Sequence, residues 1–166
     1  PSRDFVEQLR NLWWRLDRAL DRSSLRASAL VAAMDAVASG VTTVVDHHAS
    51  PSWIRGSLAT LREGFGRVGV RAALCYEVTD RNGERGAEEG LEENRSFARA
   101  AAGDPLVAAC VGAHASFTLS DRTMGRLADV AAATGRGLHV HVAEDPYDEA
   151  SARDRHGCGP LDRFDR

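Results

Sequence analysis

The sequence has no lysine, little cysteine and no long apolar run. Its three cysteines are odd in number and form no CxxC pair, which argues against a disulfide framework and a cysteine zinc site. No stretch approaches the ~20 apolar residues of a membrane span, and this excludes a membrane protein. All 21 basic residues are arginine, and the 24 acidic residues leave a net charge of −3. That balance argues against a general nucleic-acid-binding surface.

The remaining composition, 43% hydrophobic and 27% charged, is typical of a globular protein with a sizeable core. The chain begins at Pro1 without an initiator methionine or a signal peptide, and it stops at Arg166 inside a helical pattern. Both ends therefore indicate cuts, and a cytoplasmic location is expected. The sequence shows no linker and no repeat, so residues 1–166 are expected to form one domain or part of one.

Hydrophobic periodicity predicts strands that alternate with helices. The expected strands are short apolar runs at residues 41–46, 70–76, 106–113 and 138–142, the first buried on both faces. The expected helices cover residues 5–20, 24–40 (with Leu30, Met34 and Val37 at helical spacing), 51–68 opening at Ser50 and Pro51, 86–102, 121–134, and a stretch from Pro146. Short buried strands joined by crossover helices favour an α/β fold with a parallel sheet.

Five of the six histidines lie in or directly after the predicted strands: His47, His48, His114, His139 and His141. In parallel α/β folds, ligands gather at the carboxyl ends of the strands. Each single histidine could instead be a hydrogen-bonded structural residue. Adjacent strand residues point to opposite faces, so at most one of His47 and His48 is expected to face a site.

The strongest local pattern is HVHVAE at residues 139–144. His139 and His141 share one strand face, and imidazole is the commonest metal ligand. Glu144 follows three residues later, where a carboxylate beside a metal-bound water can move protons. The alternative is a buried strand with two hydrogen-bonded histidines and a surface glutamate. A GxGxxG run at residues 64–69 ends a helix instead of opening one, so it gives no support to a dinucleotide site.

Four segments together resemble the middle of an amidohydrolase-superfamily enzyme: VTTVVDHHAS at 41–50, VRAALCYE at 70–77, HASFTLS at 114–120 and HVHVAED at 139–145. The branch that they resemble most is the SsnA-type aminohydrolases, relatives of cyclic-amidine deaminases and chlorohydrolases. The tract LWWRLD at residues 12–17 also resembles this branch. The resemblance implies a (β/α)₈ barrel, of which the four expected strands would be strands two to five. A closed barrel needs roughly 250 residues, so the chain is expected to form a partial TIM barrel.

The resemblance also implies one divalent metal ion, zinc or iron, because both accept histidine and carboxylate ligands. Of the ligands of this family, only the histidine of the fifth strand can be matched, and it is His141. The other ligands, on strands one, six and eight, lie outside this sequence. Some members of the superfamily bridge two metals with a carboxylated lysine, and the absence of lysine excludes that type.

The resemblance assigns roles to the other strand-end residues. Glu144 corresponds to the glutamate that contacts a ring nitrogen of the substrate and moves protons. His114 corresponds to a histidine that binds substrate. His139 is expected inside the barrel, and His47 or His48 would line the pocket without a firm role.

The implied function is a metal-dependent hydrolase of the aminohydrolase or chlorohydrolase type. A metal-activated water would attack an sp² carbon and cleave a C–N bond of a small cyclic-amidine-like substrate. The alternative is a non-catalytic half-barrel or association module, which would expose strand edges and dimerise or aggregate; homo-oligomerisation stays open. A third hypothesis, a sugar- or phosphate-binding domain, lacks a glycine loop that opens a helix.

Overall fold

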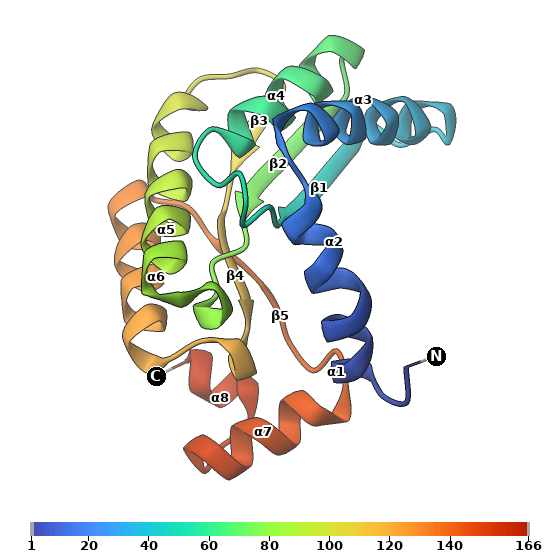
Figure 1. Cartoon of the computed structure of the whole chain (residues 1–166). Helices are drawn as coiled ribbons and strands as arrows, with labels where there is room; N and C mark the ends of the chain where they lie inside the picture. Colours follow the sequence, from blue (N-terminus) through green and yellow to red (C-terminus); the bar gives the residue numbers. More distant parts are fainter. Residues whose placement is uncertain (1, 166) are drawn as a thin grey trace.

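The computed structural model describes residues 2–165 and contains five parallel strands in two short sheets (Figure 1). The first sheet has the order β1-β2-β3, and the second pairs β4 with β5. The strands are β1 (Thr43–His48), β2 (Arg71–Tyr76), β3 (Val107–Ala109), β4 (Val111–Ala115) and β5 (Leu138–His141). All pairings are parallel, as the crossover helices predict.

Strands β3 and β4 are one stretch of chain that joins the two sheets. A single strand over 106–113 was expected, and the structure breaks it at Cys110, whose backbone N–H donates to the Leu74 carbonyl at 3.0 Å. The cause is Asn94, a fully buried side chain that replaces ladder hydrogen bonds at this point. Its Oδ1 accepts from the backbone N–H groups of Tyr76 at 2.9 Å and Gly112 at 3.3 Å.

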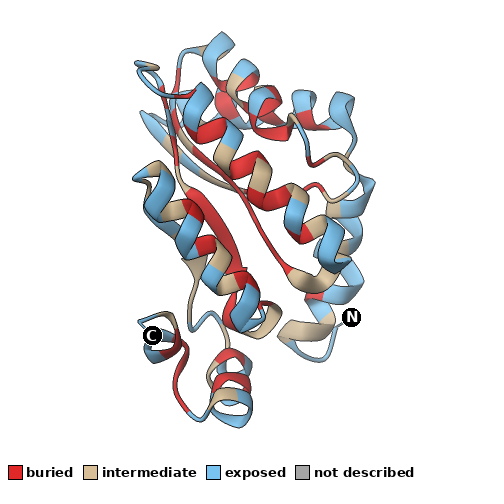
Figure 2. Cartoon of the chain, turned by 90° about the vertical axis from the view of Figure 1, so that its left-hand side faces the viewer, coloured by how far each residue is buried: buried red, intermediate tan, exposed pale blue. Residues whose placement is uncertain are grey.

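Some of the helices lie along one side of the sheets, and the others gather around the carboxyl ends of the strands (Figures 1 and 2). They are α1 (Phe5–Gln8), α2 (Trp14–Ala19), α3 (Arg22–Ala38), α4 (Ser57–Val68), α5 (Gly83–Ala100), α6 (Asp121–Thr134), α7 (Pro146–His156) and α8 (Pro160–Phe164), with a π-turn η1 (Leu9–Trp13) and 3₁₀ turns η2 (Asp80–Asn82) and η3 (Ser116–Thr118). Helix α6 has the predicted bounds, because Ser120 caps its first turn and Gly135 ends it in a left-handed conformation. None of the described helices is long and apolar enough to cross a membrane.

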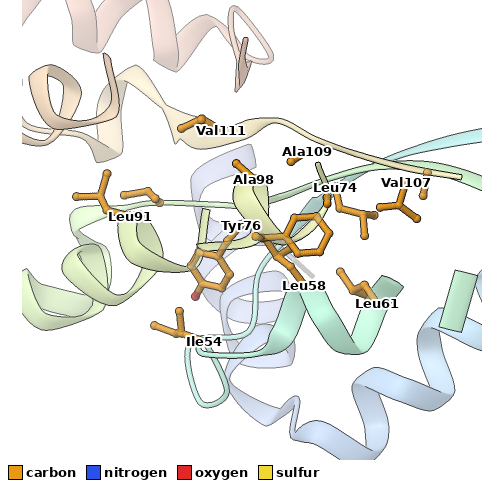
Figure 3. Close-up of a cluster of buried hydrophobic side chains, with 14 of the residues drawn as sticks. Ile54, Leu58, Leu61, Leu74, Tyr76, Leu91, Ala98, Val107, Ala109 and Val111 are labelled. Carbon is orange, nitrogen blue, oxygen red and sulfur yellow. The ribbon is translucent and has the colours of Figure 1, made fainter. Parts of the chain in front are cut away.

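The hydrophobic core lies between the sheets and helices α4, α5 and α6. Leu58, Leu74 and Leu91 are almost completely inaccessible to solvent, and Figure 3 shows them with their neighbours. By strand alternation, the core residues of β2 and β4 occupy one face, here called the helix-covered face. The opposite face, here called the open face, carries Val45 on β1, and this side chain is 60% exposed. The expectation that the first strand is buried on both faces is therefore wrong, because no described element covers the side chain of Val45.

Helix α3 packs through a different stripe from the one expected. Met34 and Val37 are 62% and 49% exposed, whereas small residues such as Ala29 and Ala33 are buried. The reason is a close approach to α4: a Cβ on Gly64 would lie 2.6 Å from the Cβ of Ala29. Small side chains on both helices allow this contact, and a larger apolar stripe could not.

The helix expected to open at Ser50 and Pro51 begins instead at Ser57. The Ser50 hydroxyl does not cap a helix, because it donates to the Trp53 carbonyl at 2.7 Å and lies 2.7 Å from Nε2 of His48. Residues 50–56 form turns, and Gly56, with φ of 84°, provides the left-handed step into α4. The first strand also begins two residues later than expected, at Thr43.

Candidate metal centre and substrate cavity

The carboxyl ends of four strands bring polar side chains together on the open face. His47 is the penultimate residue of β1, Glu77 directly follows β2, His114 lies near the end of β4, and His141 ends β5. Strand alternation places these residues on the same face as Val45. Because the strands are parallel, their carboxyl ends share one edge, and this edge carries the polar cluster.

His47 and His141 form the centre of this cluster. Nδ1 of His47 lies 2.9 Å from Nε2 of His141, and the two rings meet edge to face with centroids 4.4 Å apart. The ring of His139 stacks on His47 at 4.5 Å. Three imidazoles from two strands that are distant in the sequence therefore pack as one group.

Glu77 is a buried carboxylate, 8% exposed, beside the two imidazoles. Its Oε1 accepts a hydrogen bond from Nη2 of Arg81, one turn later in the chain. The guanidinium of Arg81 also lies over the ring of Trp14, 4.5 Å from its centroid, in a cation–π contact. Oε2 of Glu77 lies 4.0 Å from Nε2 of His114. Arg81 thus holds one carboxylate oxygen and leaves the other toward the histidines.

His114 is fixed from its other side. Nδ1 of its ring lies 2.7 Å from the Thr118 hydroxyl, in the turn that follows β4. The Thr118 hydroxyl donates to the Ala115 carbonyl at 3.1 Å, so it can accept the Nδ1 proton of His114. This tautomer leaves Nε2 with a free lone pair.

Burial governs the protonation of the cluster. It lowers the pKa of His47 to about 3, with a further contribution from the neighbouring imidazoles of His141 and His139. Burial likewise lowers the pKa of His114 to about 2. Burial raises the pKa of Glu77 to about 8, although the charge of Arg81 opposes that rise. Neutral imidazoles keep the lone pairs that metal coordination requires.

A cavity of about 360 Å³ opens onto the cluster. His47, Glu77, His114, His141 and Glu144 line it from the strand ends. The amino-terminal segment forms the facing wall with the aromatic side chains Phe5, Trp13 and Trp14. The cavity therefore combines a polar floor and a flat aromatic wall, as small-molecule sites do.

The structure separates the two adjacent histidines of β1. His47 packs against the imidazoles of the open face, whereas His48 turns toward Ser50 and the edge of the Tyr76 ring, with centroids 6.0 Å apart. Of the six residues singled out from the sequence, all except His139 line the cavity, so both His47 and His48 reach it, whereas at most one of them was expected to. The ring of His139 stacks on that of His47.

Sequence reasoning missed several polar and aromatic residues of the cavity, and three of them contact one another: Glu77, Arg81 and Trp14. Glu77 directly follows a predicted strand, so the strand-end argument applied to the histidines would have found it. The contact between Arg81 and Trp14 joins the helix before β1 to the turn after β2, and no local sequence pattern predicts it.

Among the described residues, one set of three side chains could hold a metal ion. His47, Glu77 and His141 each offer a ligand atom, and these atoms lie within 4.8 Å of one another. Two imidazole nitrogens and a carboxylate oxygen suit zinc, and this donor set occurs in catalytic zinc sites. The residues present therefore fit a divalent cation.

The chain is similar to curated deaminases over nearly its whole length. It is 28% identical to the 5'-deoxyadenosine deaminase of Methanopyrus kandleri, covering 96% of this chain and 36% of that protein. It is 26% identical to 5-methylthioadenosine/S-adenosylhomocysteine deaminase 2 of Archaeoglobus fulgidus, covering 99% of this chain and 38% of that protein. The chain thus spans little more than a third of the length of these relatives.

Solved structures confirm the expected fold. An adenosine deaminase from Xanthomonas campestris with bound zinc matches 98% of this chain and 37% of its own, with a TM-score of 0.81 at 19% identity. A guanine deaminase from C. acetobutylicum matches 98% of this chain and 40% of its own, with a TM-score of 0.83 at 14% identity. The family model for the Amidohydrolase family matches residues 2–166. The resemblance seen in the sequence is therefore confirmed, and the chain belongs to the Amidohydrolase family, of whose barrel it forms a part.

Proposed function

We propose that this chain carries part of the active site of a metal-dependent hydrolytic deaminase. The observation that supports this function best is the convergence of His47, Glu77, His114, His141 and Glu144 on one cavity. These residues come from four strand ends and a following loop, the positions where barrel enzymes gather their chemistry.

The proposed substrate is a small amino-substituted heterocycle of the cyclic-amidine type. Its amino-bearing carbon would be attacked by water, and the C–N bond would break with release of ammonia. The deaminase names of the curated relatives support an adenosine-like compound. The aromatic wall of Phe5, Trp13 and Trp14 suits a flat ring, and it would exclude bulk water from the reacting carbon.

His141 is the proposed metal ligand of the fifth strand, and zinc or iron would suit it. When bound, such an ion lowers the pKa of a coordinated water toward ~7 and so supplies hydroxide at neutral pH. The low pKa of the neighbouring His47 keeps the region beside this ligand free of positive imidazolium charge. The chain's own contribution is therefore a set of neutral nitrogen donors.

Glu144 and His114 would act on the substrate. Glu144 lines the cavity after β5 and would carry a proton to a ring nitrogen of the substrate. His114, fixed by Thr118 through Nδ1, would accept a hydrogen bond from the substrate at Nε2. Together they would orient the ring so that the amino-bearing carbon faces the attacking water.

The test uses the full-length protein that contains this chain. Purified protein is analysed for bound metal and screened for ammonia release from 5'-deoxyadenosine, 5-methylthioadenosine and related amino-heterocycles. His141→Ala is expected to lose the metal, and Glu144→Gln to keep it but lose turnover. His156→Ala, which alters a histidine outside the cavity, is the control for both measurements. A His141→Ala protein that still holds one metal per chain would overturn the assignment of this ligand.

A second candidate is an association module without catalysis. It is favoured by the apolar side chains that the open face and α3 expose, among them Val45, Val31 and Met34. In that case the chain would self-associate, because exposed apolar surface and a strand edge promote contact between copies. Size-exclusion chromatography of residues 1–166 checks this, and a sharp monomer peak with cooperative thermal unfolding would count against it.

A further inference from the structure

We propose that Arg163 is a positioning residue for substrate binding, because it holds the turn that orients His114. This inference rests on the proposed function, in which His114 contacts the substrate. Arg163 lies on α8, outside the residues that line the substrate cavity. It therefore acts through the turn η3 and through Thr118, without touching the substrate itself.

The guanidinium of Arg163 makes hydrogen bonds at both ends of η3. Its Nη1 donates to the backbone carbonyl and to the hydroxyl of Ser116, the latter at 2.9 Å, where the turn begins. Its Nη2 donates to the Leu119 carbonyl at 2.8 Å, one residue after the turn ends. Only 4% of Arg163 is exposed, so its loss would leave buried carbonyl oxygens without this donor. One planar group thus spans the whole turn and fixes the separation of its ends.

Asp121, in the first turn of α6, also holds the guanidinium. Its Oδ1 accepts from Nε of Arg163 at 3.3 Å and from Nη2 at 2.8 Å. A buried guanidinium needs such a partner, because an unpaired charge is costly to bury. The donors of the guanidinium point in fixed directions, so the ion pair with Asp121 helps to aim them at the turn. Arg163 thereby connects α8 to the start of α6 and to η3.

The turn held by Arg163 carries two side chains that contact His114. The Thr118 hydroxyl lies 2.7 Å from Nδ1 of the imidazole. The ring of Phe117 meets the imidazole edge to face, with centroids 5.7 Å apart. Both residues lie between the two positions to which the guanidinium is bound. A displaced turn would therefore move both contacts together and release the ring of His114.

The contact with Thr118 determines which nitrogen of His114 is the acceptor in the cavity. The Thr118 hydroxyl donates to the Ala115 carbonyl, so it accepts the Nδ1 proton and leaves the lone pair on Nε2. Without this contact, a neutral imidazole can carry its proton on either nitrogen. A proton on Nε2 would face an N–H or O–H group of the substrate with a second donor, and the hydrogen bond would be lost. Loss of one hydrogen bond in a buried site weakens binding by about 10-fold.

The first measurement uses the full-length protein that contains this chain, with ammonia release from an amino-heterocycle as the readout. Arg163→Lys keeps the positive charge, but a single ammonium group cannot reach both ends of the turn. We expect KM to rise about 10-fold with kcat changed by less than about 3-fold, the pattern of lost uniform binding. Arg153→Lys is the matched control, because Arg153 lies exposed on α7 and pairs with Glu149. This control should leave KM and kcat unchanged.

The second measurement needs no activity. The chain of residues 1–166 is labelled with ¹⁵N at histidine, and long-range imidazole spectra show which ring nitrogen carries the proton. The signal of His114 is identified as the one that disappears in His114→Gln. The original chain and Arg153→Lys should show His114 with its proton on Nδ1. Arg163→Lys should show a mixture of both tautomers, a change that loss of stability alone does not produce.

A double-mutant cycle tests whether Arg163 acts through Thr118. Thr118→Val removes the hydroxyl with little change of shape, and by itself it should raise KM about 10-fold. If the two residues act along one path, Arg163→Lys adds less than about 2-fold to the KM of Thr118→Val. Independent effects would instead multiply to about 100-fold, and this result would contradict the path.

The proposal is overturned if folded Arg163→Lys keeps either the original KM or the Nδ1 tautomer of His114. Circular dichroism and thermal unfolding establish whether each variant is folded. If Arg163→Lys does not fold, Asp121→Asn takes its place, because it weakens the hold on the guanidinium and keeps the backbone contacts of Arg163. The same two criteria then apply, with an expected rise in KM of about 3-fold.

Failure of this proposal differs from failure of the proposed function. If the full-length protein releases no ammonia but Arg163→Lys changes the tautomer of His114, the positioning of the ring stands and the deaminase assignment fails. If ammonia is released and Arg163→Lys changes neither KM nor the tautomer, the deaminase assignment stands and the positioning role fails.

Discussion

The two faces of the same strands differ in how completely this chain builds them. On the helix-covered face, Leu74 and Val111 are inaccessible to solvent between α4, α5 and α6. On the open face, Val45 is 60% exposed, and the polar cluster begins at the strand ends beyond it. The covered face therefore supplies stability within this chain. The open face supplies chemistry, and its apolar part is left for other surfaces to cover.

The difference between the two faces can be tested by shortening one side chain on each face and measuring the loss of stability. Leu74 and Val45 lie on paired strands, one register position apart, and they point to opposite faces. Leu74→Ala should lower the free energy of unfolding by about 2–5 kcal/mol, because it leaves a cavity in a packed core. Val45→Ala should change it by less than about 0.5 kcal/mol, since solvent already reaches that side chain.

Urea denaturation of the two variants measures both values. If both variants lose the same unfolding free energy, another surface, such as a second copy of the chain, covers the open face in solution. Repeating the Val45→Ala measurement at several protein concentrations separates that case from the monomer, because association makes stability depend on concentration.

A second comparison contrasts the junction of the two sheets with an open helix surface. A Cβ at Gly112 would lie 2.3 Å from the Tyr76 carbonyl oxygen, whereas a Cβ at Gly125 on α6 meets nothing within 4 Å. Gly112→Ala should cost about 1–3 kcal/mol through forced separation of the strands. Gly125→Ala should stabilise by about 0.5–1 kcal/mol, because glycine is a poor helix residue. Thermal unfolding should show a lower melting temperature for Gly112→Ala and a higher one for Gly125→Ala. If both melting temperatures rise or both fall, the close approach of Gly112 to the Tyr76 carbonyl, or the open surface at Gly125, is contradicted.

The smallest expected effect is a dependence of the unfolding free energy on pH, caused by Asp148 in the helix after β5. Burial raises the pKa of Asp148, whose Oδ2 accepts from the Ala143 backbone N–H at 2.8 Å. A raised pKa means that the folded chain binds the proton more tightly than the unfolded chain. This group therefore contributes less stability as the pH rises above the ordinary range of aspartate.

Asp148→Asn removes this titration and keeps an oxygen for the Ala143 N–H. The free energy of unfolding of the original chain, minus that of the variant, should therefore decrease from pH 4 to pH 7. Urea midpoints at these two pH values measure it. A difference that stays constant with pH would contradict the raised pKa.

The helix-covered face was largely predictable because its signals are local. The cap at Ser120, the stop at Gly135 and the spacing of Leu127 and Val130 fix α6 without any knowledge of its partners. The same reasoning failed at Ser50, where a cap-like serine serves a turn and a histidine instead. It also failed for α3, because the close contact between Ala29 and Gly64 joins two helices at positions 35 residues apart in the chain.

The candidate site was predictable in residue type and position, but not in contacts. Strand ends predicted where His47, His114 and His141 gather, since parallel strands share one edge. The sequence could not show that Glu77 meets them, because Arg81 and Trp14 orient this carboxylate across three separate segments. Local patterns place groups along the chain, and long-range packing decides which of their atoms meet.

The Asn94 side chain that joins the two sheets also has a dynamic consequence. The amide protons of Tyr76 and Gly112 are bound to its Oδ1, and its Nδ2 donates to the Tyr76 carbonyl at 2.8 Å. These two protons can exchange with solvent only after α5 moves away from the sheet and carries Asn94 with it. In native-state hydrogen exchange they would be among the slowest in the molecule, and their rate would report how often the joined sheets open as a unit.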